Sequence, residues 1–181
     1  MKYILLFTAL LFVSIAHSQT TAKITDEEIY SFINQQIPDS SLIENRFREF
    51  GDTDNIVSIM GRFPEYFRDG DKEFMFQQIS NQTGKIKKRL ITGNAKKLIS
   101  KSKIRWIFRG RDFDRSWNRF YKKKAKGFYR VSKPIFSTDR NIAIFYIGFH
   151  CGSLCGKGGK FIYKKKKDVW ERVEISYMWV S

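Results

Sequence analysis

The sequence predicts an α+β fold in which N-terminal helices pack on a C-terminal antiparallel sheet arranged as a meander. In the first half of the chain, apolar residues recur at the spacing of amphipathic helices. From Gly127 onward, short apolar runs separated by turn residues are typical of strands. Helices followed by a series of strands indicate an α+β fold, and we expect the helices to cover one face of the sheet.

The first helix is predicted over residues 24–37. Thr25 is a suitable N-cap residue, and Glu28 three positions later completes a capping box. Apolar side chains follow on one face at helical spacing, and Pro38 ends the pattern. Signals at both ends therefore bound this helix.

Other segments before residue 127 have weaker patterns. Residues 41–50 and 71–79 have helical apolar spacing, and residues 114–124 predict a short helix with three aromatic rings on one side. Residues 104–108 instead have the composition of a strand.

The strands are predicted from the apolar runs of the last third. The expected strand segments are residues 128–132, the region of 136, 142–149, 160–163 and 170–180. Residues 142–149 are apolar on both faces, as a central buried strand would be. In the last strand, alternation predicts inward Val173, Ile175, Tyr177 and Trp179 and outward Arg172, Glu174 and Ser176.

Residues 1–18 have the pattern of a cleaved signal peptide. An apolar run follows Lys2, and Ala16 and Ser18 are small residues at positions −3 and −1 of a cleavage site. We therefore expect an exported protein, periplasmic or secreted, with a single soluble α+β domain over residues 19–181. An N-terminal anchor that stays attached is the alternative.

The positive charge is concentrated in the second half of the chain. The formal net charge is +16. Residues 19–80 carry six Lys/Arg and twelve Asp/Glu, whereas residues 81–181 carry twenty-seven Lys/Arg and six Asp/Glu. Such asymmetry indicates an anionic partner, such as nucleic acid, phospholipid headgroups or a polysaccharide. A solvated basic face is the alternative.

Both cysteines lie in one glycine-rich segment, HCGSLCGKGGK, residues 150–160. A zinc site there would need a ligand from elsewhere, because His150 is the only histidine after signal cleavage. Cysteine catalysis needs a histidine beside the thiolate, but neighbouring strand residues such as His150 and Cys151 point to opposite faces. A phosphate-binding loop would need a different spacing and a following helix. We therefore expect no catalytic residue, no metal and no cofactor at this segment.

A disulfide between Cys151 and Cys155 is the remaining interpretation. Exported chains meet oxidising conditions, which favour disulfides. An extended strand would separate the two Cα atoms by about 13 Å, whereas a disulfide requires roughly 4.4–6.8 Å. The chain must therefore turn, and Gly152 and Gly156 are suited to the positive φ angles of such a turn. The expected role is to fix the tip of a hairpin.

The last third of the chain resembles a group of uncharacterised bacterial exported proteins. The matching residues are Trp117, Phe120, Tyr121, Phe136, Ala143, Tyr146, Cys151, Gly152, Leu154, Cys155, Gly156, Gly158 and Trp170. The repeated Cys-Gly pair is the most specific of these, and the resemblance covers about residues 113–175. It implies a strand–CGxLCGxG–strand hairpin and transfers no catalytic residue.

Cations and aromatic rings are interleaved between residues 105 and 124. The candidate anion-binding residues are Arg105, Arg109, Arg111, Arg115, Arg119, Lys122, Lys123 and Lys124. Such a mixture suits contact with an anionic polymer or with an anionic membrane or cell-envelope surface. The alternative is that the rings belong to the core and the cations form a solvated rim.

These observations favour an exported, non-enzymatic binding or interaction protein. Its basic C-terminal half would contact an anionic ligand or surface. The alternative is a cell-envelope hydrolase of unrecognised type, which would gather acidic residues or His150 in a deep pocket.

Overall fold

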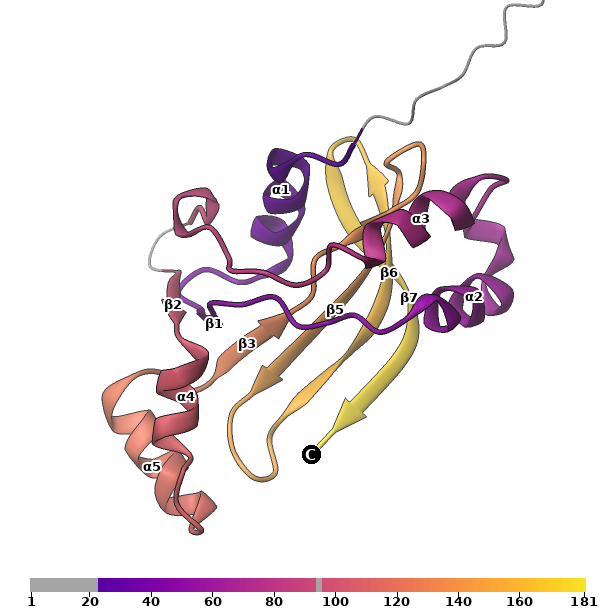
Figure 1. Ribbon diagram of the computed structural model, residues 1–181. Helices are drawn as coiled ribbons and strands as arrows, with labels where there is room; N and C mark the ends of the chain where they lie inside the picture. The colour runs from indigo at the N-terminus through magenta and orange to yellow at the C-terminus, as the bar shows by residue number, and fades with distance from the viewer. Residues whose placement is uncertain (1–22, 94–95) are drawn as a thin grey trace, which may run out of the picture.

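The computed structural model describes residues 23–93 and 96–181, and a seven-stranded mixed sheet lies at its centre (Figure 1). The elements follow the order α1 (Asp26–Gln36), β1 (Leu42–Glu44), α2 (Thr53–Arg62), η1 (Pro64–Tyr66), α3 (Asp71–Ile79), η2 (Lys88–Leu90), β2 (Lys97–Ile99), α4 (Lys101–Ile107), α5 (Phe113–Lys123), β3 (Phe128–Val131), β4 (Ile135–Phe136), β5 (Ile142–His150), β6 (Lys157–Lys166) and β7 (Val169–Val180). The predicted signal peptide, residues 1–18, lies outside the described residues. Within these, no helix has both the length and the apolar character needed to cross a membrane.

The sheet order is β2-β1-β3-β5-β6-β7, and β4 pairs with β5. The predicted meander is confirmed for β5, β6 and β7, which pair antiparallel in chain order. The prediction of an entirely antiparallel sheet is wrong, because β1 pairs in parallel with both β2 and β3. Parallel neighbours require long crossover connections, and the helical segments between β1 and its partners provide them.

Helices cover both faces of the sheet, so the prediction of one covered face is also wrong. Side chains of β5 alternate between the faces: Ala143 and Phe145 belong to a cluster with α1, whereas Ile142 and Ile144 belong to a cluster with α2 and α3. In Figure 1, α1 and the α2–α3 pair flank the sheet separately. The two-sided apolar composition of β5 reflects this double cover, as predicted for a central strand.

Helix α1 confirms the first predicted helix. The Thr25 side chain accepts a hydrogen bond from the Glu28 backbone, and the Glu28 carboxylate accepts one from the Thr25 backbone. Phe32 is fully buried on the face toward the sheet. Its ring lies 5.0–5.9 Å, between centroids, from four rings of the strands, in edge-on geometry: Phe136, Phe145, Tyr163 and Trp170. Edge-to-face packing of this kind adds to the free energy gained by burial.

Two element predictions are wrong in the part of the chain before residue 127. Residues 41–50 form no helix; they begin with β1, whose Leu42 and Ile43 are buried between β2 and β3. Sheet pairing and burial here outweigh a weak helical pattern. The helix lies further on, as α2, which Asp52 begins by accepting a hydrogen bond from the Asn55 backbone.

The segment 104–108, predicted as a strand, belongs to helix α4. Ser100 caps this helix by accepting a hydrogen bond from the Lys103 backbone N–H. Ile104 and Ile107, three residues apart, are both buried on one helix face. Helical spacing of these two side chains therefore decides the structure over their β-branched composition. The predicted helices at 71–79 and 114–124 are confirmed as α3 and α5.

The predicted alternation of β7 is wrong in its second half. Ile175 and Tyr177 are exposed, whereas Ser176 is buried. Two register shifts in the β6–β7 pairing, opposite Lys160/Phe161 and Ile162/Tyr163, place extra residues in β7. A β-bulge of this kind reverses which side chains face the core.

Three glycines of β5, β6 and the loop between them make room for the Trp179 ring. A Cβ atom at Gly156 or Gly158 would lie 3.0 Å from atoms of this ring, and one at Gly148 would lie 3.2 Å from it. Contacts this short are not tolerated by real side chains without movement. The glycines around the cysteines therefore leave a surface without side chains, on which the Trp179 ring of neighbouring β7 packs.

Candidate anion-binding surface

Helices α4 and α5 form a hairpin beside the β2–β1–β3 edge of the sheet (Figure 1). Asp112 caps α5 by accepting a hydrogen bond from the Arg115 backbone N–H at 2.8 Å. Trp117 and Phe120 on the inner face of α5 are buried against Phe128 of β3. These two rings belong to the core, which agrees with the alternative that the rings of this segment are core residues and its cations a solvated rim.

The predicted cations lie on both helices and on the segment between them. Arg105 is on α4, Arg109 and Arg111 are in the connection, and Arg115, Arg119, Lys122, Lys123 and Lys124 are on α5 or directly after it. Apart from Lys123, whose side chain is not described, all of these side chains are exposed. Arg115 pairs with Asp112 at 3.5 Å, a contact between exposed groups that is worth little free energy. The hairpin is therefore a strongly basic surface.

Three exposed apolar side chains accompany these cations. Trp106 of α4 is 56% exposed, and Phe113 at the start of α5 is 53% exposed. Leu154, in the loop that joins β5 to β6, is 89% exposed. The Arg109 guanidinium lies 5.3 Å from the centre of the Trp106 ring, at cation–π distance. Trp106 belongs to the interleaved rings and cations that the sequence indicated, whereas Phe113 and Leu154 were not predicted as binding residues. The available signals were that Phe113 lies off the apolar face of α5 and that Leu154 is an apolar residue in a glycine-rich loop.

A hollow of about 210 Å³ lies between α4 and α5. Its lining combines Lys103, Trp106 and Ile107 from α4 with Arg119 of α5 and Lys124 after it. The structure thus brings two of the predicted cations, Arg119 and Lys124, beside an exposed indole ring. This combination of an apolar floor and a cationic rim suits a ligand with both apolar and anionic parts.

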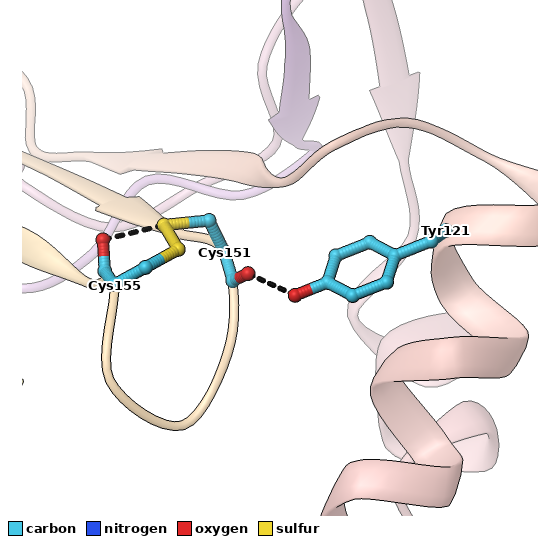
Figure 2. The surroundings of a disulfide bond; sticks show 3 residues. All are labelled: Tyr121, Cys151 and Cys155. Atoms are coloured by element: carbon cyan, nitrogen blue, oxygen red, sulfur yellow. Dashed lines mark hydrogen bonds between the residues drawn. A yellow bond between two sulfur atoms is a disulfide. The ribbon is translucent and has the colours of Figure 1, made fainter.

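Cys151 and Cys155 lie at disulfide distance in the loop that joins β5 to β6 (Figure 2). Their sulfur atoms are 2.09 Å apart and their Cα atoms 5.5 Å apart, so the chain turns between them as predicted. Gly152 has a φ of +150°, which favours glycine. The same expectation for Gly156 is wrong, because its φ is not positive and the glycine instead gives space to Trp179 and Ser181.

The cysteine loop is bound to helix α5. The Tyr121 hydroxyl donates a hydrogen bond to the Cys151 carbonyl oxygen, and Figure 2 shows this tyrosine reaching from α5 toward the loop. The Ser153 hydroxyl donates to the Asp114 carboxylate at 2.6 Å, near the start of the helix. Contacts at two positions along α5 thus hold the loop, and with it the exposed Leu154, against the basic hairpin.

His150 is packed between two aromatic rings at the end of β5. Its ring centroid lies 5.3 Å from that of Phe128 and 5.2 Å from that of Trp179. Burial, aided by the positive charges of Arg130 and Arg48, lowers the pKa of His150 to about 4. Among the described residues, the Nε2 atom of His150 has no hydrogen-bond partner, so this atom is not paired with a cysteine sulfur. Among the described residues, no three His, Cys, Asp or Glu side chains gather where they could hold a metal ion.

No protein-family model, curated protein or solved structure matches this chain. The resemblance of residues 113–175 to exported proteins therefore stays a prediction.

Proposed function

We propose that this chain is an exported, non-enzymatic binding protein that attaches to an anionic membrane surface through the α4–α5 hairpin and the tip of the cysteine loop. The observation that carries the proposal is the exposure of Trp106, Phe113 and Leu154 beside a dense group of cations. Residues 101–126 contain eleven lysines and arginines but two aspartates.

The chemistry of these side chains suits a bilayer with anionic headgroups. Each cation near such a surface contributes about 1 kcal/mol of attraction at physiological ionic strength. Exposed tryptophan, phenylalanine and leucine side chains gain free energy when they enter the boundary between headgroups and acyl chains. Leu154 has no π face, so its exposure is better explained by insertion into lipid than by stacking on a polymer.

The contacts of the cysteine loop support a preorganised surface. Tyr121 and Asp114 of α5 bind the loop at two positions just before Leu154, namely Cys151 and Ser153. A loop already held in place loses less conformational entropy on binding than a free one. The disulfide would serve the same purpose by limiting the conformations of the tip.

An anionic polymer is the second candidate partner, favoured by the hollow in which Trp106 lies beside Lys103 and Arg119. An indole ring and cations in one hollow suit stacking combined with phosphate, sulfate or carboxylate contact. The hydrolase alternative has no observation of its own at the hairpin, and it stays a prediction.

Vesicle co-sedimentation tests the membrane proposal. Mature protein should bind vesicles that contain phosphatidylglycerol, should bind phosphatidylcholine vesicles much less, and should be released only in part by high salt, because apolar insertion is not screened. A Trp106→Ser, Phe113→Ser and Leu154→Ser variant should lose the salt-resistant part of binding. An Arg111→Gln and Arg115→Gln variant should weaken binding to anionic vesicles.

A Lys72→Gln and Lys164→Gln variant is the matched control. It also removes two positive charges, but from exposed positions on α3 and β6, away from the hairpin. Equal loss in this control would show that only net charge matters and would overturn the assignment to the hairpin. Binding to heparin without binding to vesicles would favour the polymer.

Export is tested separately on the protein from its own host. We expect mature protein in the extracytoplasmic fraction with Gln19 as its first residue, because the predicted cleavage site follows Ser18. Protein that retains residues 1–18 in the membrane fraction would favour the anchor.

A further inference from the structure

A second basic site lies on the sheet face that α2 covers. A cleft of about 890 Å³ opens between α2, the segment after β1 and the strands β5 to β7. Its polar lining includes one carboxylate, that of Glu49, together with Arg48, Asn55, Arg62, Tyr146, Lys160 and Ser176. Clefts of roughly 300–1,000 Å³ are typical of sites for small molecules.

Three cations from separate elements converge on this cleft. Arg48 follows β1, Arg62 ends α2, and Lys160 lies on β6. Among the described residues, none of these three forms an ion pair with a carboxylate, although ion pairs occur elsewhere on the protein, such as that between Arg130 and Glu44. Three cations therefore face a single lining carboxylate, that of Glu49, and this excess of positive charge raises the local potential and favours an anionic ligand.

Contacts with neutral groups hold these cations in place. Arg62 donates from one terminal nitrogen to the Ser176 carbonyl oxygen at 2.9 Å and from the other to the Ser176 hydroxyl at 2.8 Å. Lys160 donates to the side-chain oxygen of Asn55, and its amine lies 4.7 Å from the centre of the Phe50 ring. Each cation therefore keeps further N–H groups for a ligand.

The Arg48 guanidinium is placed by Tyr146. It lies 4.5 Å from the centre of the Tyr146 ring and donates to the tyrosine hydroxyl at 2.9 Å. The backbone N–H of Arg48 donates to the Val131 carbonyl oxygen at 2.7 Å, which fixes the segment against β3. A planar guanidinium fixed in this way suits bidentate contact with an oxyanion.

The Tyr146 hydroxyl is itself an oriented donor. It accepts hydrogen bonds from Arg48 and from the indole N–H of Trp179, the latter at 3.3 Å, which occupies both oxygen lone pairs. The described part of the chain provides no acceptor for its own proton. Tyr146 is almost fully buried but lines the cleft, so a ligand oxygen there would satisfy this donor.

Lys160 lies in a partly buried environment beside another cation, Arg48. Burial lowers the pKa of its amine, the Asp52 carboxylate opposes that change, and Arg48 adds to it. Asp52 does not reach the amine, because the Asn55 side chain lies between them and donates to Asp52 at 2.7 Å. Binding an anion would remove the repulsion between Arg48 and Lys160.

We propose that this cleft binds a small molecule through a phosphate or sulfate ester group, contacted by Arg48, Lys160, Arg62 and the Tyr146 hydroxyl. A tetrahedral oxyanion offers three outward oxygens, which match these donors better than the two oxygens of a carboxylate. The cleft is larger than the anion alone, so the remainder of the ligand would lie beside Phe50 and the exposed Tyr177 ring. This site is independent of the proposed membrane attachment.

Titration of the mature protein with glucose 6-phosphate, glucose 6-sulfate and glucose at constant ionic strength tests the proposal. Nuclear magnetic resonance of the indole N–H groups is a direct readout, because Trp179 donates to Tyr146 and Trp106 lies in the distant hairpin. We expect the Trp179 signal, assigned with a Trp179→Phe variant, to shift with the esters and not with glucose. The two ester titrations distinguish phosphate from sulfate ligands.

Substitutions then locate the ester group. Lys160→Gln and Tyr146→Phe should each weaken ester binding, the lysine change by about tenfold or more, because hydrogen bonds to charged groups are lost. Lys157→Gln is the matched control, since it removes the same charge from an exposed position of the same strand. Melting temperatures identify any variant that fails to fold, and the wild-type shifts do not depend on any variant.

Three results would overturn the proposal. These are the absence of a Trp179 shift with either ester, an equal shift with glucose, and equal weakening by Lys157→Gln. The Arg111→Gln and Arg115→Gln hairpin variant should retain ester binding while its vesicle binding falls. Failure of the cleft proposal and failure of the membrane proposal are therefore observed in different assays.

Discussion

The hydroxyl group of Tyr121 donates a hydrogen bond to the carbonyl oxygen of Cys151, and this bond ties helix α5 to the cysteine loop. The two residues are thirty positions apart, so the contact joins the basic hairpin to the tip of the central β5–β6 pair. The cysteine loop is in this way part of the surface of the α4–α5 hairpin.

Replacing Tyr121 by phenylalanine should lower the free energy of unfolding by about 1 kcal/mol, the usual net value of one such hydrogen bond. The ring and its stacking on Trp117 would remain. Urea unfolding measures the change, with Tyr177→Phe as control, because that side chain is exposed and its hydroxyl makes no hydrogen bond within the described part of the chain. Equal effects of the two substitutions would contradict the bracing role of Tyr121.

Gly158→Ala should destabilise the protein by about 1–3 kcal/mol, the usual cost of forcing an atom into a packed interior. The added Cβ would lie 2.5 Å from the Gly148 Cα, 2.8 Å from the Ile147 carbonyl oxygen and 3.0 Å from the Trp179 ring. Two of these neighbours are backbone atoms, which cannot move aside as a flexible side chain can.

Gly61→Ala is the control for this prediction and should have the opposite sign. Gly61 lies in α2, and an added Cβ would meet no atom within 4 Å. Alanine in a helix is favoured over glycine by about 0.5–1 kcal/mol. Thermal unfolding of both variants is the measurement, and a stabilised Gly158→Ala protein would refute the close packing of Trp179 on the glycines.

The burial of His150 predicts a pH dependence of stability. Its pKa is about 4 in the folded protein, below the ordinary value of 6.5 expected when the chain unfolds. Between these pH values the unfolded chain binds more protons, so the free energy of unfolding falls as the pH is lowered from 6.5 toward 4.

A His150→Phe variant isolates this contribution. Phenylalanine keeps the packing on Phe128 and Trp179 but cannot bind a proton. The stability difference between wild type and variant should therefore change by roughly 1–3 kcal/mol in favour of the variant between pH 7 and pH 4. Urea unfolding across this range is the test, and parallel pH curves for the two proteins would contradict the assignment.

Local signals in the sequence were sufficient for some elements. Helix α1 was predictable because Thr25, Glu28 and Pro38 mark its ends within the segment itself. Strand β5 was predictable because a strand buried on both faces needs apolar residues at every position. The proximity of the two cysteines was predictable because they are the only cysteines in the sequence and lie four positions apart in a glycine-rich segment.

Other features depend on contacts between distant segments. The parallel pairing of Leu42 with Lys97 and of Ile43 with Tyr129 has no local signature, so β1 resembles a weak helix in the sequence. The bulges of β7 likewise follow from its pairing with β6, and they reverse the alternation around Ser176.

The two candidate sites differ in the same respect. The hairpin cations were recognisable because they follow one another between residues 105 and 124. The cleft was not, because Arg48, Arg62 and Lys160 come from segments that only the folded sheet brings together. The hydrogen bonds that hold these cations on neutral groups, such as Tyr146, are evident only from the structure.

The ion pair between Glu44 and Arg130 provides a final test of how the parallel edge of the sheet is held. The Arg130 Nε lies 2.6 Å from a Glu44 carboxylate oxygen, and Glu44 is 6% exposed on β1. Because β1 and β3 pair through a single register position, Ile43 with Tyr129, this side-chain contact reinforces a short strand pairing.

Arg130→Met should destabilise the protein by about 3–5 kcal/mol, because it leaves the Glu44 carboxylate buried without its cation. Adding Glu44→Gln to that variant should restore part of the loss, since a neutral amide is much less costly to bury than an unpaired carboxylate. Chemical denaturation of the two single variants and the double variant forms a complete cycle. Strictly additive effects would show that the two side chains do not interact, and the edge strand β1 would then depend on its backbone hydrogen bonds and apolar packing.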